Sequence, residues 1–231
     1  MKSEKYEFIF RRLATILATA IVTLSLTAAI TGILLAYYYE PSAGGAYDSL
    51  QTIDTEVSNG WLIHTLHDLA GNGLIGVSLI EIVVMFLGRK YQPSWLTAWI
   101  SGILLTLSAI ALGWTAMILD WSQLGYWRLS IELQTIEAIP FIGPQLRAIL
   151  TGGGAIGTET VEHFYTIHSY VLSVGALAIA IIHLAAIILQ EIEQKRLQIK
   201  LEANSLITES ENGETPLEPT PLSLTGGTSK H

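Results

Sequence analysis

The sequence predicts an all-α integral membrane protein, a bundle of four transmembrane helices with short surface helices between the third and fourth spans. Half of the 231 residues are hydrophobic and 14% are charged, and the mean hydropathy of +0.46 lies outside the range of ordinary soluble domains. Four segments contain no Lys or Arg, and each exceeds the roughly 20 residues that a helix needs to cross a bilayer. They are residues 13–38, 62–87, 95–119 and 164–189.

The basic residues predict how the spans are oriented. One cluster precedes the first span, a second follows the second span and a third follows the fourth, whereas the loop 40–60 has four acidic residues and no Lys or Arg. With four spans, all three clusters fall on one side of the membrane, so the positive-inside rule predicts that both termini are cytoplasmic. The clusters include Arg11 and Arg12, Arg89 and Lys90, and Lys195, Arg196 and Lys200.

The segments outside the spans divide into two kinds. Residues 120–163 combine Trp121, Tyr126 and Trp127 with an apolar run that contains Pro140 and Pro144, which favours short helices lying at the outer surface. Residues 191–231 instead form a cytoplasmic tail, which is charged and amphipathic to about residue 203 and then rich in proline and glutamate, a composition typical of disorder. We therefore expect a transmembrane domain over residues 1–190 and a tail over residues 191–231.

Two of the spans carry ionisable side chains at helical spacing. His67 and Glu81 are 14 residues apart in the second span, and His168 and His183 are 15 apart in the fourth. At about 100° per residue, each interval returns a side chain to roughly the same face, on the order of 20 Å further along the axis. Ionisable groups inside a span are costly and indicate function. Two such helices facing each other could place ligand pairs at two heights and hold haem between them.

Composition also limits the chemistry. The chain has no cysteine, which excludes disulfides, thiolate metal sites, iron–sulfur clusters and haem attached through a CxxC motif. A cofactor must therefore bind to imidazole or carboxylate. The net charge of −8 comes mostly from the loops and the tail, and no basic groove with aromatic platforms occurs, so we expect no nucleic-acid partner.

Six short motifs follow one another in a specific order. They are TGILLAYYYEP around Gly32, TEVSNGWLIHTLH ending at His67, WISGILL at 99–105, LDWSQLGYW at 119–127, EAIPFIG at 137–143 and HFYTIHSYVL around His168. In this order and spacing, residues 13–190 resemble the cytochrome b6 / cytochrome b N-terminal family, the four-helix haem-binding core of quinol–cytochrome c or plastocyanin oxidoreductases. The 15-residue interval in the last span is similar to the b6 form.

The resemblance implies two haems b, each bound between one histidine of the second span and one of the fourth. His67 and His168 match the pair near the outer side, and His183 matches one ligand of the haem near the cytoplasmic side. The partner position of His183 is occupied here by Glu81, which is the main departure from the family pattern. The chain is therefore expected to bind one haem b or two, with His67, His168 and His183 as the iron ligands.

Three arrangements of Glu81 are open. Glu81 and His183 could form a hydrogen-bonded pair with no haem between them, or His183 could hold a five-coordinate haem with Glu81 on the distal side, or Glu81 could itself bind ferric iron. A carboxylate is a poor axial ligand for ferrous haem because it is hard and anionic. In either of the first two arrangements, Glu81 could also relay protons towards a quinone site.

The resemblance assigns further residues to the cofactor. Gly32 and Gly102 match glycines on which the porphyrin lies, and Gly113 joins this cofactor-binding set, although all three could instead be small residues for close helix packing. Ala18 and Ala116 replace the other two glycines of the family. The basic residues that neutralise the propionates correspond to His64, Asp68 and His163, two of which could simply be solvated interfacial histidines. The thiol that anchors an extra haem in the b6 form corresponds to Ile16, so no covalently held haem is expected.

The function expected from the resemblance is electron transfer through haem b in exchange with quinone. The chain would be a redox subunit of a quinol oxidoreductase complex rather than a complete enzyme, and we assign it no catalytic residue. The implied partners are a Rieske-type protein, a c-type cytochrome, a subunit IV-like membrane protein, membrane lipid and a second copy of the chain as a homodimer. The membrane would be a bacterial inner or thylakoid-type membrane. The alternative is a diverged structural or scaffold membrane subunit with one haem or none, which the departures at positions 18, 81, 95 and 116 favour.

Overall fold

The computed structural model describes residues 2–88 and 95–211, which are all helical or in the connections between helices. Four stretches within these residues are long and apolar enough to cross a membrane, namely Ile9–Ala36, Gly60–Gly88, Leu96–Ala116 and Thr158–Thr208. The all-α fold with four spans that the sequence predicted is therefore confirmed. The chain divides into two compact units, Met1–Gln190 and Glu191–His231.

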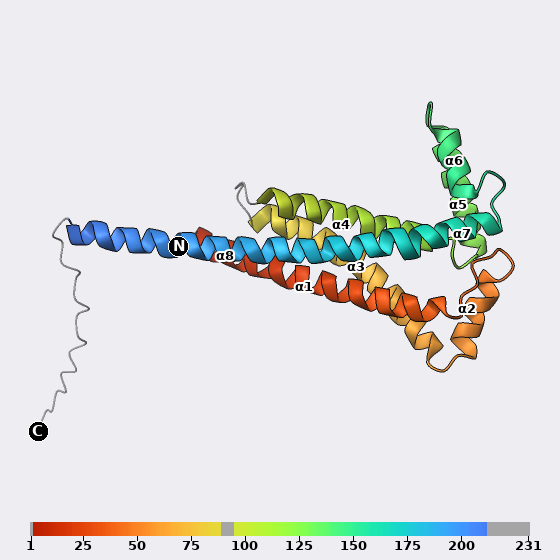
Figure 1. The fold of residues 1–231 in the computed structure, drawn as a ribbon, viewed down its shortest axis with the longest axis horizontal. Coiled ribbons are helices and arrows are strands. Elements are labelled where there is room, and N and C mark those ends of the chain that lie inside the picture. Colours follow the sequence, from red (N-terminus) through yellow and green to blue (C-terminus); the bar gives the residue numbers. More distant parts are fainter. Residues whose placement is uncertain (1, 89–94, 212–231) are drawn as a thin grey trace, which may run out of the picture. The chain divides into compact units, whose positions relative to one another are not determined.

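Four long helices run side by side in the first unit (Figure 1). α1 (Lys2–Ala36) packs against α3 (Gly60–Gly88), α3 packs against α4 (Trp95–Ala116), and the first half of α8 (Ser173–Glu211) completes the bundle. Large apolar side chains such as Ile33, Leu69 and Phe86 remain exposed on the outside of the bundle. Helices that are apolar all round, as these are, bury their faces in a membrane as well as against each other.

Short helices lie together at one end of this unit (Figure 1). α5 (Gln123–Glu137), α6 (Gly143–Thr151) and α7 (Thr158–Thr166) connect α4 to the last span, as the sequence predicted, whereas α2 (Ala46–Thr55) was not predicted. Local sequence features mark where two of these helices begin or end. At the start of α5 the Ser122 side chain accepts a hydrogen bond from the Gly125 N–H. At the end of α6 Gly152 adopts the left-handed backbone conformation, with φ 77°.

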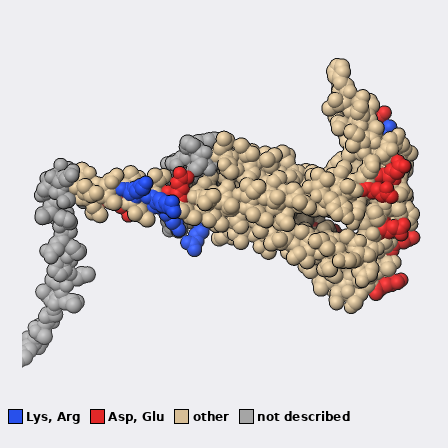
Figure 2. Space-filling model, viewed as in Figure 1, with Lys and Arg blue, Asp and Glu red and all other residues tan. Residues whose placement is uncertain are grey.

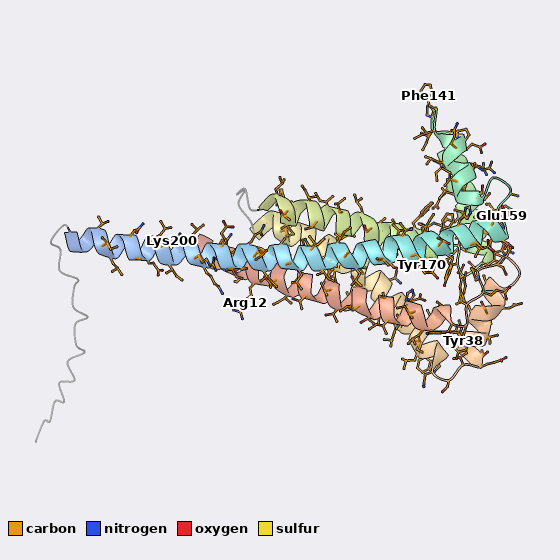
Figure 3. The ribbon with its side chains drawn as sticks, in the orientation of Figure 1. Arg12, Tyr38, Phe141, Glu159, Tyr170 and Lys200 are labelled. Atoms are coloured by element: carbon orange, nitrogen blue, oxygen red, sulfur yellow. The ribbon has the colours of Figure 1, made fainter. Side chains whose placement is uncertain are left out.

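The two ends of the first unit differ in charge (Figure 2). Carboxylates gather over α2, α7 and the start of α3, whereas Arg12 marks the opposite end (Figure 3). We call these the acidic end and the basic end. The basic residues Arg89 and Lys90 lie outside the described residues.

Three apolar clusters fill the bundle from one end to the other. The cluster nearest the basic end contains Ala14, Ala18, Val84, Met85, Ala98, Ala186 and Ile187. The middle cluster contains Ile21, Leu74, Leu105, Ala109 and Ala180, and the cluster nearest the acidic end contains Ile118, Leu129, Leu133 and Phe164. The histidines of the spans lie between these clusters.

The second unit begins inside α8, which continues to Glu211. The helix therefore extends past residue 203, where the sequence predicted that the amphipathic segment ends. The remaining part of the predicted disordered tail, residues 212–231, lies outside the described residues.

Candidate functional site

His67 and His168 face each other in the half of the bundle nearer the acidic end. Their ring centroids are 6.3 Å apart and their planes are inclined by 60°. An imidazole nitrogen binds a metal at about 2.0–2.1 Å, so two imidazoles on opposite sides of one metal have ring centres about 6 Å apart. The two rings thus have the separation of two axial ligands to a single metal ion. We call this pair the acidic-end site.

Helix α1 fixes the ring of His67. The His67 Nδ1 lies 2.9 Å from the carbonyl oxygen of Ala28 and 3.1 Å from the Thr31 Oγ1, one helical turn further along the same helix. An Nδ1–H that donates to the carbonyl leaves Nε2 with a lone pair, which is the tautomer that a metal ligand requires. The Nε2 atom has no hydrogen-bond partner among the described residues.

Helix α4 fixes the ring of His168 in the same way. The His168 Nδ1 lies 3.1 Å from the carbonyl oxygen of Leu112 and 3.0 Å from the Thr115 Oγ1, again a carbonyl and a hydroxyl separated by three residues. The sequence identified both histidines but not these hydroxyl groups. In both cases the Thr lies three residues after the residue whose carbonyl faces the ring, Thr31 after Ala28 and Thr115 after Leu112. A Thr or Ser in a span next to a histidine-bearing span is the signal that could have found them.

A π-helical segment, η1 (Ile167–Leu172), carries His168. Its N–H···O=C bonds span five residues, as between the Ser173 N–H and the His168 carbonyl. A π turn inserts one residue into an α-helix, so the 15-residue interval from His168 to His183 matches the 14-residue interval from His67 to Glu81. The sequence predicted a regular helix here, and the interval of 15 was the only sign of the insertion.

Two glycines lie directly against histidine rings. A Cβ atom on Gly32 would lie 2.9 Å from the His67 Cε1, and one on Gly102 would lie 3.0 Å from the His183 Cε1. Each glycine follows the hydroxyl residue that contacts the same ring, Thr31 in one case and Ser101 in the other.

Gly113, the third glycine of the predicted set, contacts neither ring. A Cβ atom there would lie 2.9 Å from the Ile75 Cδ1, at the end of a flexible side chain of α3. The structure therefore separates Gly113 from the two glycines that support histidines.

Glu81 and His183 contact each other directly in the half nearer the basic end, which we call the basic-end site. The Glu81 Oε1 lies 3.2 Å from the His183 Nε2, and the side chains are 3% and 0% exposed. The two atoms are within ion-pair distance but are not aligned for a hydrogen bond, and neither has another hydrogen-bond partner among the described residues. The other ring nitrogen, Nδ1, lies 2.9 Å from the Ser101 Oγ.

The histidines near the acidic end have protein partners of their own. The His64 Nδ1 lies 2.9 Å from the Asp54 Oδ1, and its Nε2 lies 3.8 Å from the Asp68 Oδ2. The His163 Nδ1 lies 2.8 Å from the carbonyl oxygen of Ile149. These contacts hold His64, on α3, against α2 and His163, on α7, against α6.

Tyr39 ties the end of the first span to the end of the third. Its hydroxyl donates to the Leu119 carbonyl over 2.7 Å, and its ring lies 5.5 Å from the ring of Tyr165. Burial, followed by the charges of Tyr165 and Asp120, raises the pKa of Tyr39 well above its ordinary value.

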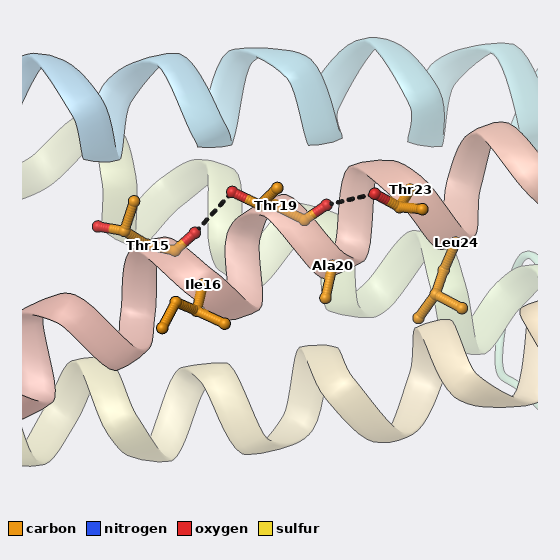
Figure 4. A pocket seen from close by; sticks show the side chains of 6 residues that line it. All are labelled: Thr15, Ile16, Thr19, Ala20, Thr23 and Leu24. Atoms are coloured by element: carbon orange, nitrogen blue, oxygen red, sulfur yellow. Dashed lines mark hydrogen bonds between the residues drawn. The ribbon is translucent and has the colours of Figure 1, made fainter.

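An open groove follows the outer face of α1 and is lined by Thr15, Ile16, Thr19, Ala20, Thr23 and Leu24 (Figure 4). Its threonine hydroxyls donate to carbonyls four residues earlier in the same helix, as Thr19 does to Thr15 over 2.8 Å. The groove therefore presents mainly apolar surface.

Comparison with known proteins gives consistent matches along the bundle. The sequence model of the family described as Cytochrome b/b6/petB matches residues 9–191. A cytochrome b6 of Auxenochlorella protothecoides is 31% identical over 153 residues, which cover 66% of this chain and 71% of that protein. A cytochrome b6 of Acaryochloris marina is 32% identical over 142 residues, which cover 62% of this chain and 66% of that protein.

The fold is also similar to that of a solved chain of a hyperthermophilic respiratory complex III. The TM-score is 0.64 and the identity 23%, and the match covers 77% of this chain and 47% of that chain. The likeness shows a shared fold, and this chain spans about half of the length of the solved one.

Proposed function

Because the chain belongs to the cytochrome b/b6 family, we propose that it is a haem b electron-transfer subunit of a bc-type membrane complex. The observation that carries the proposal is the His67–His168 pair, with ring centroids 6.3 Å apart and both Nδ1 atoms held by neighbouring helices. The donor set of two imidazoles fits haem b. When bound, haem supplies a carrier for single electrons.

The residues around the pair would orient the ligands. Thr31 and the carbonyl of Ala28 hold one ring, and Thr115 and the carbonyl of Leu112 hold the other, so neither imidazole must reorient when it binds iron. Gly32 leaves room for the His67 ring beside α1. The apolar clusters on either side exclude water, and a dry environment is one of the properties through which a protein sets a haem potential.

We assign the rest of the reaction to partner molecules. Quinone would exchange electrons with the bundle, and a Rieske-type protein, a c-type cytochrome and a subunit IV-like membrane protein would supply the remaining steps. A second copy of the chain would form a homodimer. The clusters of Lys and Arg that precede the first span and follow the second and fourth spans support an orientation with both termini cytoplasmic, in a bacterial inner or thylakoid-type membrane.

A second candidate is a diverged scaffold subunit without redox function. The direct contact between Glu81 and His183, 3.2 Å apart where the family has a ligand pair, favours it. The intact ligand geometry at the acidic-end site favours the redox function. Haem content distinguishes the two.

The test is the spectrum of the full-length chain purified from membranes with an adequate haem supply. The reduced protein should show a six-coordinate, low-spin haem b. His67→Ala and His168→Ala should each abolish this spectrum while the chain still inserts. Gly76→Ala, at a position on α3 where no atom lies within 4 Å of the added Cβ, is the control and should leave the spectrum unchanged. A native chain without haem would contradict the redox function and support the scaffold.

A further inference from the structure

The family resemblance implies a second haem between positions 81 and 183, and the basic-end site can be tested for its fit. A haem iron there would need two donor atoms on opposite sides of the metal, about 4 Å apart if each bond is about 2 Å. The Glu81 Oε1 and the His183 Nε2 are 3.2 Å apart. In addition, a carboxylate is a poor axial ligand for ferrous haem. The donor set and its spacing therefore do not fit a second haem.

The packing around this pair leads to the same conclusion. Glu81 and His183 are 3% and 0% exposed, and the adjoining cluster contains Met85 together with side chains from α1, α4 and α8. Beside Gly102, the space that a Cβ atom would occupy is bounded by the His183 ring and by the Met85 sulfur. Met85 thus packs beside the His183 ring at this site, whereas the three atoms nearest to a Cβ on Gly32 all belong to the His67 ring.

The support for the ligands differs as well. At the acidic-end site, α1 provides the Thr31 hydroxyl and Gly32 next to His67. Fourteen residues earlier, close to four helical turns, α1 carries Leu17 and Ala18, which pack in the cluster beside Glu81. No hydroxyl therefore occupies the position on α1 that would orient a ligand at residue 81.

From these observations we infer that the chain holds one haem, between His67 and His168, and that Glu81 and His183 form a buried pair that closes the second site. The inference rests on the proposed function. It restricts electron exchange to the half of the bundle nearer the acidic end, since this chain then has no second haem through which an electron could cross the membrane.

The decisive measurement is the amount of non-covalent haem per full-length chain purified from membranes. One haem per chain, with a single one-electron step in a redox titration, is the expected result. The reduced spectrum should also ignore carbon monoxide, because both axial positions of the single haem are occupied. Two haems per chain, or a carbon monoxide complex formed by a second haem beside the low-spin one, would overturn the inference while leaving the proposed function intact. A chain without haem would instead overturn the proposed function.

A double variant provides an independent test. Glu81→Met combined with His183→Leu replaces the buried pair with apolar side chains of similar size, a change that proteins often tolerate. Haem per chain and the low-spin spectrum should stay the same as in the native protein. A folded double variant with less haem would show that His183 takes part in haem binding and would overturn the inference. If the variant does not fold, the haem count of the native chain still decides.

Discussion

His67 and His168 have the separation of two ligands to one metal ion and form an open pair, whereas Glu81 and His183, at the other level of the bundle, contact each other directly and form a closed pair. The ring centroids of the first pair are 6.3 Å apart, a spacing that corresponds to ligand nitrogens about 4 Å apart, whereas the polar atoms of the second pair are 3.2 Å apart. Both histidines of the open pair are held back by a carbonyl and a hydroxyl of the adjacent helix. Glu81 has no such hydroxyl beside it on α1. The difference indicates that the separation of a ligand pair depends on the carbonyl and hydroxyl groups that contact the ligand rings as much as on the ligands themselves.

The closed pair has a cost that its surroundings must offset. Both polar atoms are buried without a hydrogen bond in good geometry, and a buried group without its partner is more costly still. Glu81 and His183 are therefore interdependent, because among the described residues Glu81 has no polar partner but His183, and His183 has none but Glu81 and Ser101.

The largest effect should come from separating this pair. Either Glu81→Met or His183→Leu alone leaves one buried polar partner uncompensated, which should lower the free energy of unfolding by about 3–5 kcal/mol. The double variant should recover most of that loss, since no polar group is then left alone. Thermal unfolding of the four proteins in detergent measures the coupling between the two residues.

The same four proteins also test whether the basic-end site is closed while the acidic-end site is not. If the effects of the single substitutions simply add, residues 81 and 183 are not coupled and the basic-end site is not a closed pair. A haem measurement on the same four proteins should give one haem per chain throughout.

Much of this arrangement was predictable from the sequence. The apolar segments gave the four spans because each is about the length of a bilayer crossing, and the motifs around His67 and His168 gave the family. The sequence also showed that Glu81 breaks the pattern. It left three arrangements of Glu81 open, because spacing along one helix does not determine whether two side chains on different helices touch.

Other features depend on tertiary contacts that a linear pattern does not display. Thr31, Thr115 and Ser101 look like ordinary small polar residues of a span, and their role is visible only when the histidine rings lie beside them. α2 was missed because its ten residues fall in a loop of acidic and small residues. The π-helical segment η1 was missed because a single inserted residue changes no residue type.

Substituting Gly32 and Gly102 should affect the acidic-end site and the basic-end site differently. Both effects should be smaller than the effect of breaking the Glu81–His183 pair. Gly32→Ala places a methyl group 2.9 Å from the His67 Cε1, so the ring must move and haem affinity should fall by about tenfold, as for other perturbed supports of a ligand. Gly102→Ala places a methyl group 3.0 Å from the His183 Cε1 and should destabilise the fold by about 1–3 kcal/mol without changing haem per chain. Haem titration and thermal unfolding distinguish the two responses.

Gly76→Ala is the matched control for this pair, because no atom lies within 4 Å of its added Cβ on α3. It should preserve haem affinity and should not lower stability. Loss of haem in Gly102→Ala as great as in Gly32→Ala would show that both levels bind cofactor.

The smallest effect concerns Tyr39, which joins α1 to the end of α4 at the acidic end and has no counterpart at the basic end among the described residues. Tyr39→Phe leaves the Leu119 carbonyl without its donor and should cost about 0.5–1.5 kcal/mol of stability at neutral pH. The exposed Tyr38→Phe is the control and should have no measurable effect.

The pKa of Tyr39 is raised by burial from the value of 10.0 that it has when unfolded, so above pH about 10 the unfolded chain loses a proton that the folded chain keeps. Stability should therefore fall as the pH rises beyond 10, and less steeply in Tyr39→Phe than in the native protein. Equal slopes of unfolding free energy against pH in the two proteins would show that Tyr39 is not held protonated by its site.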